Sequence, residues 1–194
     1  SMGCSLVVYG RRPADLALAS LLQNRLGLPI YLHEGNKQQN GFLVESWPCG
    51  LVIEIGPVAQ GLLHERIIHQ TRIALEVCLE ELGKIKNGKG RFPDFLIIHR
   101  HIKNIDFPRD DKGSPHSFIH HALQDKDWRP ISFGSPLFQS AEGAILRMSE
   151  MKSLVPVFIN EAAYLEKNIS LGFTKREVWT FTNKWELALK KLFN

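Results

Sequence analysis

One carboxylate, Glu54, stands inside a short apolar run and is the first candidate for chemistry in this sequence. The run, residues 51–55, is followed by Gly56-Pro57 and then by a long helical pattern. An apolar run this short is typical of a strand buried on both faces. Because a carboxylate is costly to bury, Glu54 is expected either to be paired within the fold or to act as an acid or base at the strand's end. The residue alone leaves both alternatives open.

A second group of polar residues follows another apolar run. Residues 154–159 have the pattern of a buried strand, and Asn160-Glu161-Ala162-Ala163-Tyr164 comes directly after it. Polar groups beside a buried strand need partners, so Glu161 and Tyr164 are candidates for a site. The alternative is a structural hydrogen-bond network between domains.

The histidines do not form a recognisable metal motif. His33-Glu34 lacks the second histidine that a helical zinc motif requires. His116, His120 and His121 would have ligand-like spacing on a helix, but Ser114-Pro115 precedes them and no cysteine cluster accompanies them. These residues are expected in a solvated turn, and the sequence itself predicts no metal ligand.

The elements that must position the candidates change character near residues 84–93. The first part alternates strands with helices, which is typical of an α/β domain, and the second part is mostly strands. We therefore expect a partial α/β domain over residues 1–90 and a β-rich domain over residues 91–194. Expected strands are 4–9, 28–33, 51–55, 95–105, 154–159 and 178–182, a hairpin joins 137–139 to 144–146, and expected helices are 13–26, 61–82 (ended by Gly83) and 185–193.

Composition excludes several classes of protein. Hydrophobic residues make up 44% of the 194 residues, charged residues 23%, and the net charge is +4, which indicates a globular domain. The basic segment 84–91 contains no aromatic residue, so a loop is favoured over a nucleic-acid surface. No apolar run approaches the length of a membrane span. The three cysteines are widely spaced, which indicates free thiols and a cytoplasmic location.

Several motifs, taken together and in this order, resemble the succinylglutamate desuccinylase/aspartoacylase family. Their matches to the aspartoacylase signatures are collinear and extend over nearly the whole chain. They are Met2-Gly3-Cys4, residues 52–57 with Gln60-Gly61, residues 105–110 with Gly113, residues 123–130 and residues 156–164.

The resemblance implies a fold and a reaction. The fold would be the C-terminal part of a zinc-carboxypeptidase-like α/β domain, followed by a β-rich C-terminal domain that caps the active-site channel. The reaction would be the zinc-dependent hydrolysis of N-acetyl-L-aspartate, a small molecule, to acetate and L-aspartate. Glu54 matches the family's general base for the zinc-bound water, and Tyr164 matches a tyrosine that binds the substrate carboxylate.

The sequence also departs from the family's pattern. The family's N-terminal His-x-x-Glu pair does not occur here, and its third zinc ligand precedes the segment with which this chain begins. We therefore expect a C-terminal portion whose zinc ligands lie in an N-terminal region, which is inactive by itself and can form homo-oligomers. The alternatives are a deacylase for other N-acyl amino acids, a succinylglutamate desuccinylase, and a non-catalytic interaction module.

Overall fold

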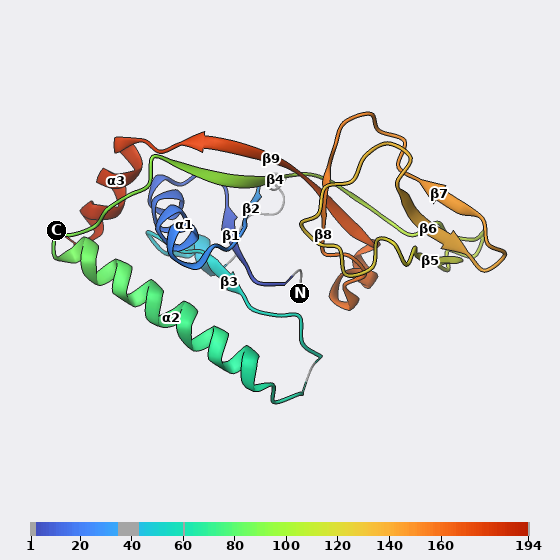
Figure 1. The fold of residues 1–194 in the computed structure, drawn as a ribbon, viewed down its shortest axis with the longest axis horizontal. Coiled ribbons are helices and arrows are strands. Elements are labelled where there is room, and N and C mark those ends of the chain that lie inside the picture. Colours follow the sequence, from blue (N-terminus) through green and yellow to red (C-terminus); the bar gives the residue numbers. More distant parts are fainter. Residues whose placement is uncertain (1–2, 35–42, 60, 194) are drawn as a thin grey trace. The chain divides into compact units, whose positions relative to one another are not determined.

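The computed structural model describes residues 3–34, 43–59 and 61–193. The chain divides into two compact units (Figure 1). Unit 1 comprises Gly3–Arg100 and Glu177–Asn194, and unit 2 comprises His101–Arg176. Two long strands, β4 (Phe95–Ile105) and β9 (Leu171–Thr180), contribute residues to both units.

Unit 1 contains a mixed sheet. Strand β1 (Ser5–Tyr9) pairs in parallel with β2 (Ile30–His33), and β2 pairs in parallel with β4. Strand β3 (Val52–Glu54) pairs antiparallel to β1. The order of the whole sheet is β3-β1-β2-β4-β9-β8, so β3 is an edge strand.

Three helices pack together in unit 1: α1 (Pro13–Leu26), α2 (Glu65–Lys86) and α3 (Asn183–Lys190). Helix α1 lies against β1 (Figure 1). It begins at a proline, whose fixed φ suits a first turn, and ends at Gly27, which adopts a left-handed conformation with φ of 68°.

One face of the unit 1 sheet forms the core with these helices. Alternate strand residues share a face, so Leu6 and Val8 of β1 lie beside Ile30 and Leu32 of β2. Helix α1 supplies the other half of this core and is buried over most of its length. Burial of this size is the main stabilising contribution to the unit. The core's helical members are Ala14, Leu16, Ala17, Leu18, Ala19, Leu21, Leu22, Ile85 and Leu189.

Unit 2 is built mainly from strands. A three-stranded antiparallel sheet has the order β5-β6-β7, from Ser117–Ile119, Pro136–Ser140 and Ile145–Arg147. Strand β8 (Val155–Val157) pairs antiparallel to β9, and a 3-10 helix, η2 (Ala162–Lys167), precedes β9. The unit's own core includes the fully buried rings of Phe138 and Phe173 and the side chains of Leu123 and Leu171.

The strand that carries Glu54 differs from its sequence-based expectation. We expected a strand buried on both faces, but the three residues of β3 are only partly buried because β3 pairs with a neighbour on one side. Its apolar residues remain consistent with the fold, since Leu51 and Ile53 pack against the core formed by the helices. Helix α2 also differs, because it continues through Gly83 to Lys86.

The contact-based units and the expected domains 1–90 and 91–194 divide the chain at different places. Residues 183–190 form α3, which packs on α1 in unit 1, although they follow the strands of unit 2 in sequence. The division at residue 90 stays a prediction. Over the described residues, no helix is both long and apolar enough to cross a membrane.

Candidate functional site

Glu54 is the last residue of edge strand β3. It pairs with Ser5 of β1 in the antiparallel register. The residue is half-buried. Immediately after it, the Gly56-Pro57 peptide bond is cis, and the thiol of Cys4 lies 3.7 Å from the carbonyl oxygen of Gly56. Glu54 therefore lies at the end of the strand, directly before the Gly56-Pro57 turn.

Two further groups define the surroundings of Glu54. Burial raises the pKa of the Tyr9 hydroxyl, and the nearby carboxylates of Glu54 and Glu45 raise it further. Tyr9 and Ser5 lie on the same face of β1 because they are four residues apart in one strand. The Tyr9 phenol is thus kept protonated close to two negative charges.

Ser5 adds a polar atom to this face. It is fully buried, and among the residues that the structure describes its hydroxyl oxygen has no hydrogen-bond partner. Directly paired residues on adjacent strands point to the same face of a sheet, so Ser5 and Glu54 share a face. A buried hydroxyl without a partner is unfavourable unless a ligand or water completes it. It is a hydrogen-bonding group available beside Glu54.

The segment that leads into β3 is held by Arg12, which sequence reasoning missed. Its guanidinium donates hydrogen bonds to the carbonyl oxygens of Val44 at 2.9 Å and Trp47 at 2.6 Å, among others. It also donates to the buried carboxylate of Asp15 at 2.6 Å, which in turn accepts the backbone amide of Gly50 at 2.9 Å. These contacts fix residues 44–50 against the start of α1 and thereby fix the approach to Glu54.

Asp15 is a buried carboxylate with a structural role. Burial raises its pKa, while the hydrogen bonds from Gly50 and Arg12 act in the opposite direction. Burial also raises the pKa of the neighbouring Cys49 thiol to about 12, with a further contribution from Asp15. A thiol with this pKa stays protonated near neutral pH, so Cys49 is not a nucleophile here.

Tyr164, the second predicted site residue, lies in the 3-10 helix η2 of unit 2. Its ring makes an edge-to-face contact with Phe158 at a centroid distance of 5.1 Å. The ammonium group of Lys167 lies 5.5 Å from the centre of the Tyr164 ring. The ring is half-buried, so these neighbours orient it without enclosing it.

Strained backbone gathers around Tyr164. Phe158, Asn160 and Asn168 each have φ of 56°, a conformation that is uncommon for residues other than glycine. Such positions persist when the surrounding structure compensates for their cost, and they concentrate at functional sites. Here a hydrogen bond from the Asn160 amide to the Ser170 carbonyl, at 2.8 Å, helps to hold the turn.

Asp127 supports the same turn and was not identified from the sequence. Its carboxylate accepts the backbone amide of Ile159 at 3.3 Å. Its pKa is raised to about 6, mainly by burial and also by the charge of Glu161, while the hydrogen bond from the Ile159 amide acts in the opposite direction. Glu161, the other sequence candidate, is thus near this carboxylate, and its backbone carbonyl accepts the Tyr164 amide at 2.9 Å.

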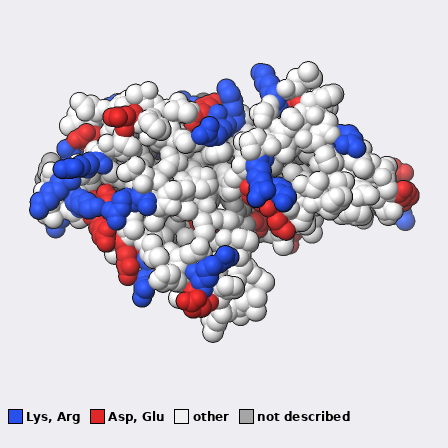
Figure 2. Space-filling model, in the orientation of Figure 1, with Lys and Arg blue, Asp and Glu red and all other residues white. Residues whose placement is uncertain are grey.

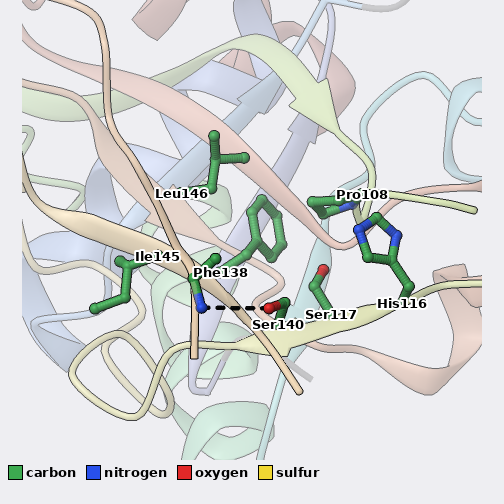
Figure 3. Close-up of a pocket in the computed structure, with 8 residues that line it drawn as sticks. Pro108, His116, Ser117, Phe138, Ser140, Ile145 and Leu146 are labelled. Carbon is green, nitrogen blue, oxygen red and sulfur yellow. Dashed lines mark hydrogen bonds between the residues drawn. The ribbon is translucent and has the colours of Figure 1, made fainter. Parts of the chain in front are cut away.

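Unit 2 also contains a cavity of about 310 Å³ that shares no residue with the Tyr164 turn. Figure 3 shows Phe138, Ile145 and Leu146 from β6 and β7 on its apolar side, opposite His116 and Pro108. The backbone amide of Ala144 donates to the Ser140 hydroxyl at 3.3 Å (Figure 3). The cavity is a hydrophobic recess between strands and offers few groups that could act on a substrate.

The remaining histidines are distributed, not clustered. His120 and His121 contact each other, with ring centroids 4.2 Å apart. His121 is exposed in a turn as expected, but His120, directly after β5, is buried, so the expectation of a solvated turn was wrong for it. Alternation along residues 95–105 predicts His99 on the solvent face of its strand, opposite Leu96 and Ile98, but the structure shows that its side chain is buried. Within residues 3–34, 43–59 and 61–193, no group of three or more His, Cys, Asp or Glu could hold a metal ion. The described residues around Glu54 therefore do not fit a zinc site.

Comparison with known proteins shows which proteins this chain is similar to. Residues 94–176 match the family model of the AstE/AspA barrel-sandwich hybrid domain. A probable aspartoacylase from Prochlorococcus marinus is 58% identical over 197 residues, which cover 100% of this chain and 64% of that protein. A probable aspartoacylase from Synechococcus sp. is 53% identical, covering 99% of this chain and 63% of that protein.

A solved structure gives the same result for the fold. The crystal structure of murine aminoacylase 3 matches with a TM-score of 0.77 and 27% sequence identity, over 92% of this chain and 60% of that chain. The predicted fold class, an α/β part of zinc-carboxypeptidase type followed by a β-rich domain, is thereby confirmed.

Each of these comparisons supports the resemblance to the aspartoacylase family that the motifs indicated. The chain spans 64% of the length of the Prochlorococcus relative.

Proposed function

We propose that this chain contributes to a deacylase-type hydrolase, an aspartoacylase that converts N-acetyl-L-aspartate to acetate and L-aspartate. The observation that carries the proposal is the 58% identity, over the whole chain, to a protein named as a probable aspartoacylase. The half-buried Glu54 lies at the end of β3, which follows the segment held by Arg12, and supplies a carboxylate suited to the chemistry.

In the proposed reaction, Glu54 is the general base. A carboxylate at this position accepts a proton from the attacking water and returns it to the nitrogen of the leaving amine. The partly exposed side chain is compatible with this role, because a base must reach a water molecule in the site. The buried hydroxyl of Ser5, on the same face, is placed to donate a hydrogen bond to an enclosed water beside Glu54, or to accept one from it.

Tyr164 is proposed to bind the substrate carboxylate. A phenol hydroxyl is a hydrogen-bond donor, and a donor to a charged acceptor contributes more than a donor to a neutral one. The contacts of its ring with Phe158 and Lys167 limit its motion and support this role. Lys167 also brings a positive charge to the surroundings of the hydroxyl.

Zinc is the proposed metal cofactor. Its chemistry is to lower the pKa of a bound water. Because the described residues contain no arrangement that could hold it, the ligands are proposed to lie outside them. We accordingly propose that the chain is inactive by itself.

A second candidate is the deacylation of other N-acyl amino acids. The structural match to murine aminoacylase 3 favours this reading, and succinylglutamate desuccinylase chemistry belongs to the same class of reaction. In each case the partner is a small molecule. Cytoplasmic location and a homo-oligomeric state complete the proposal, and the free thiols of Cys4, Cys49 and Cys78 are compatible with a reducing compartment.

A substrate panel tests the proposal. The chain is assayed with added zinc, alone and joined to the zinc-binding region of a longer relative, against N-acetyl-L-aspartate, N-succinyl-L-glutamate and N-acetyl-L-tyrosine. We expect turnover of N-acetyl-L-aspartate by the joined form only. Preferred turnover of another substrate would support the second candidate. No turnover of any substrate by a folded, zinc-loaded joined form would support a non-catalytic module.

A further inference from the structure

A second cavity lies in unit 1, on the side of α1 that faces the C-terminal end of α2. Its volume is about 330 Å³, and it shares no residue with the surroundings of Glu54. It is lined by Leu21, Asn24 and Arg25 of α1, Glu81 and Lys84 of α2, and Lys89 and Arg91 of the following segment. Seven residues from three segments that are distant in sequence thus meet around one space.

The lining carries a surplus of positive charge. The buried carboxylate of Glu81 accepts hydrogen bonds from Arg25 and, at 2.7 Å, from Lys84. Arg25 also donates to Glu80 at 3.0 Å. The negative charges of these two carboxylates offset the positive charges of Arg25 and Lys84, so two cations of the cavity lining remain uncompensated.

The two remaining cations are Lys89 and Arg91. Among the described residues, neither side chain makes an ion pair or a hydrogen bond, and the side-chain amide of Asn24 has no partner either. Both cations are exposed at the rim of the cavity, where an anion from solvent can reach them. Figure 2 shows Lys and Arg side chains gathered over the C-terminal end of α2.

The backbone after α2 is folded to place these side chains at the cavity. Gly88 has φ of 71°, and its amide donates to the Ile85 carbonyl at 3.0 Å. The Lys89 amide donates to the Lys84 carbonyl at 2.8 Å, which turns the chain back toward the helix. Gly90 packs so closely on Ile85 that a Cβ there would lie 2.1 Å from the Ile85 Cδ1 atom. The segment is therefore a packed turn that fixes the backbone of Lys89 beside the cavity.

We propose that this cavity binds a small anion of the phosphate or phosphate-ester class. Lys89 and Arg91 supply the two uncompensated charges, which match the charge of about −1.5 to −2 on a phosphate group at neutral pH. Arginine binds the oxygens of such a group in pairs, and the Asn24 amide offers a further donor. The volume is near the lower limit of roughly 300–1,000 Å³ for ligand cavities, which suits a small ligand. This proposal does not rest on the proposed deacylase function.

Titration calorimetry with inorganic phosphate and with pyrophosphate, at constant low ionic strength, tests the proposal. The test variant is the double substitution Lys89→Ala and Arg91→Ala. The control is Lys86→Ala with Lys191→Ala, which removes the same charge from exposed side chains outside the cavity. Neither Lys89 nor Arg91 makes a side-chain ion pair or hydrogen bond with the described residues. We therefore expect both double variants to keep the melting temperature of the parent chain.

We expect saturable binding of one anion per chain, weakened by about tenfold or more in the test variant and by less than about twofold in the control. Citrate serves as a carboxylate comparison and is expected to bind more weakly than pyrophosphate. Equal weakening by the two double variants would overturn the proposal, because it would indicate general attraction to a basic surface. Non-saturable heats, or binding of citrate without binding of phosphate, would also overturn it.

Discussion

Substitution of Asp127 by asparagine gives the most quantitative prediction from this structure. Burial of the Asp127 carboxyl raises its pKa from an ordinary value of 3.8 to about 6, with Glu161 as the nearby acidic group. Each unit of pKa difference between the folded and unfolded chains corresponds to about 1.4 kcal/mol, so a shift of about two units gives about 3 kcal/mol at most. Because the Asp127 carboxyl is partly exposed, screening by solvent reduces this contribution to the free energy of unfolding, and we expect about 1–2 kcal/mol.

The sign follows from the proton affinity of each state. The folded chain binds the Asp127 proton more tightly than the unfolded chain, so the associated stabilisation is complete below about pH 4 and is lost as the pH rises through about 6. In the Asp127→Asn variant the side chain does not titrate, although its amide oxygen can still accept the Ile159 amide. The difference in free energy of unfolding, parent minus variant, should therefore fall by about 1–2 kcal/mol between pH 4 and pH 7.

Urea unfolding at a series of pH values, followed by tryptophan fluorescence, measures this difference. The control is Asp125→Asn, which changes an exposed carboxylate two residues away that accepts the Gln124 side-chain amide. The control should show no comparable dependence on pH. A parent-minus-variant difference for Asp127 that stays constant from pH 4 to pH 7 would refute the reasoning about its burial.

Three further predictions concern the elements that hold the site. Arg12→Ala should lower the free energy of unfolding by about 3–5 kcal/mol in urea titrations, because it removes the cation that pairs with the buried carboxylate of Asp15. The control is Arg11→Ala at an exposed position, which should lower the free energy of unfolding by less than about 1 kcal/mol. Equal losses in the two variants would contradict this prediction. Gly50→Ala should cost about 1–3 kcal/mol in the same assay, because its Cβ would lie 2.7 Å from the Val44 carbonyl oxygen, and an unchanged stability would contradict the close approach. In a form that turns over N-acetyl-L-aspartate, Tyr164→Phe should raise KM by roughly tenfold or more, since a hydrogen bond to a charged group is lost; an unchanged KM would exclude Tyr164 from substrate binding.

Local patterns in the sequence were sufficient to predict several of the regular elements, although they missed β5 and most of β9, which was expected only over residues 178–182. Helix α1 begins at Pro13 and ends before Gly27 as expected, because both residues act through their own backbone geometry. Strand β4 occupies residues 95–105, as its alternation predicted. The end of α2 was wrong because Gly83 weakens a helix without forcing it to stop, and Ile85 packs into the core beyond it.

The pairing of β3 could not be predicted from its own residues. An apolar run indicates burial, but it does not distinguish a central strand from an edge strand that is covered on one face by helices. Position within the sheet is decided by β1, which is about 50 residues away in sequence. The same limitation applied to His99, whose side of the strand was predicted from alternation alone.

The supporting residues of the candidate site depend on similarly distant contacts. Arg12 is three residues before Asp15, and this spacing suggests an ion pair at a helix start. The carbonyl groups it binds belong to residues 44–50, which only the folded chain brings close. For Asp127, the sequence offered only a charged residue within the segment 123–130. The hydrogen bond that its carboxylate accepts from the Ile159 amide is seen only in the structure.

The central claim is that Glu54 is the base of a deacylase, and one comparison of variants tests it most directly. Glu54→Gln is introduced into the form that includes the zinc-binding region, and kcat and bound zinc are measured together. The control is Glu76→Gln, an exposed carboxylate on α2 whose partner is Arg72. We expect Glu54→Gln to lower kcat for N-acetyl-L-aspartate by roughly 10²–10⁴-fold with zinc content unchanged, and the control to keep full activity. Full activity of the Glu54→Gln protein would contradict the account and leave Glu54 as a structural residue of the sheet edge.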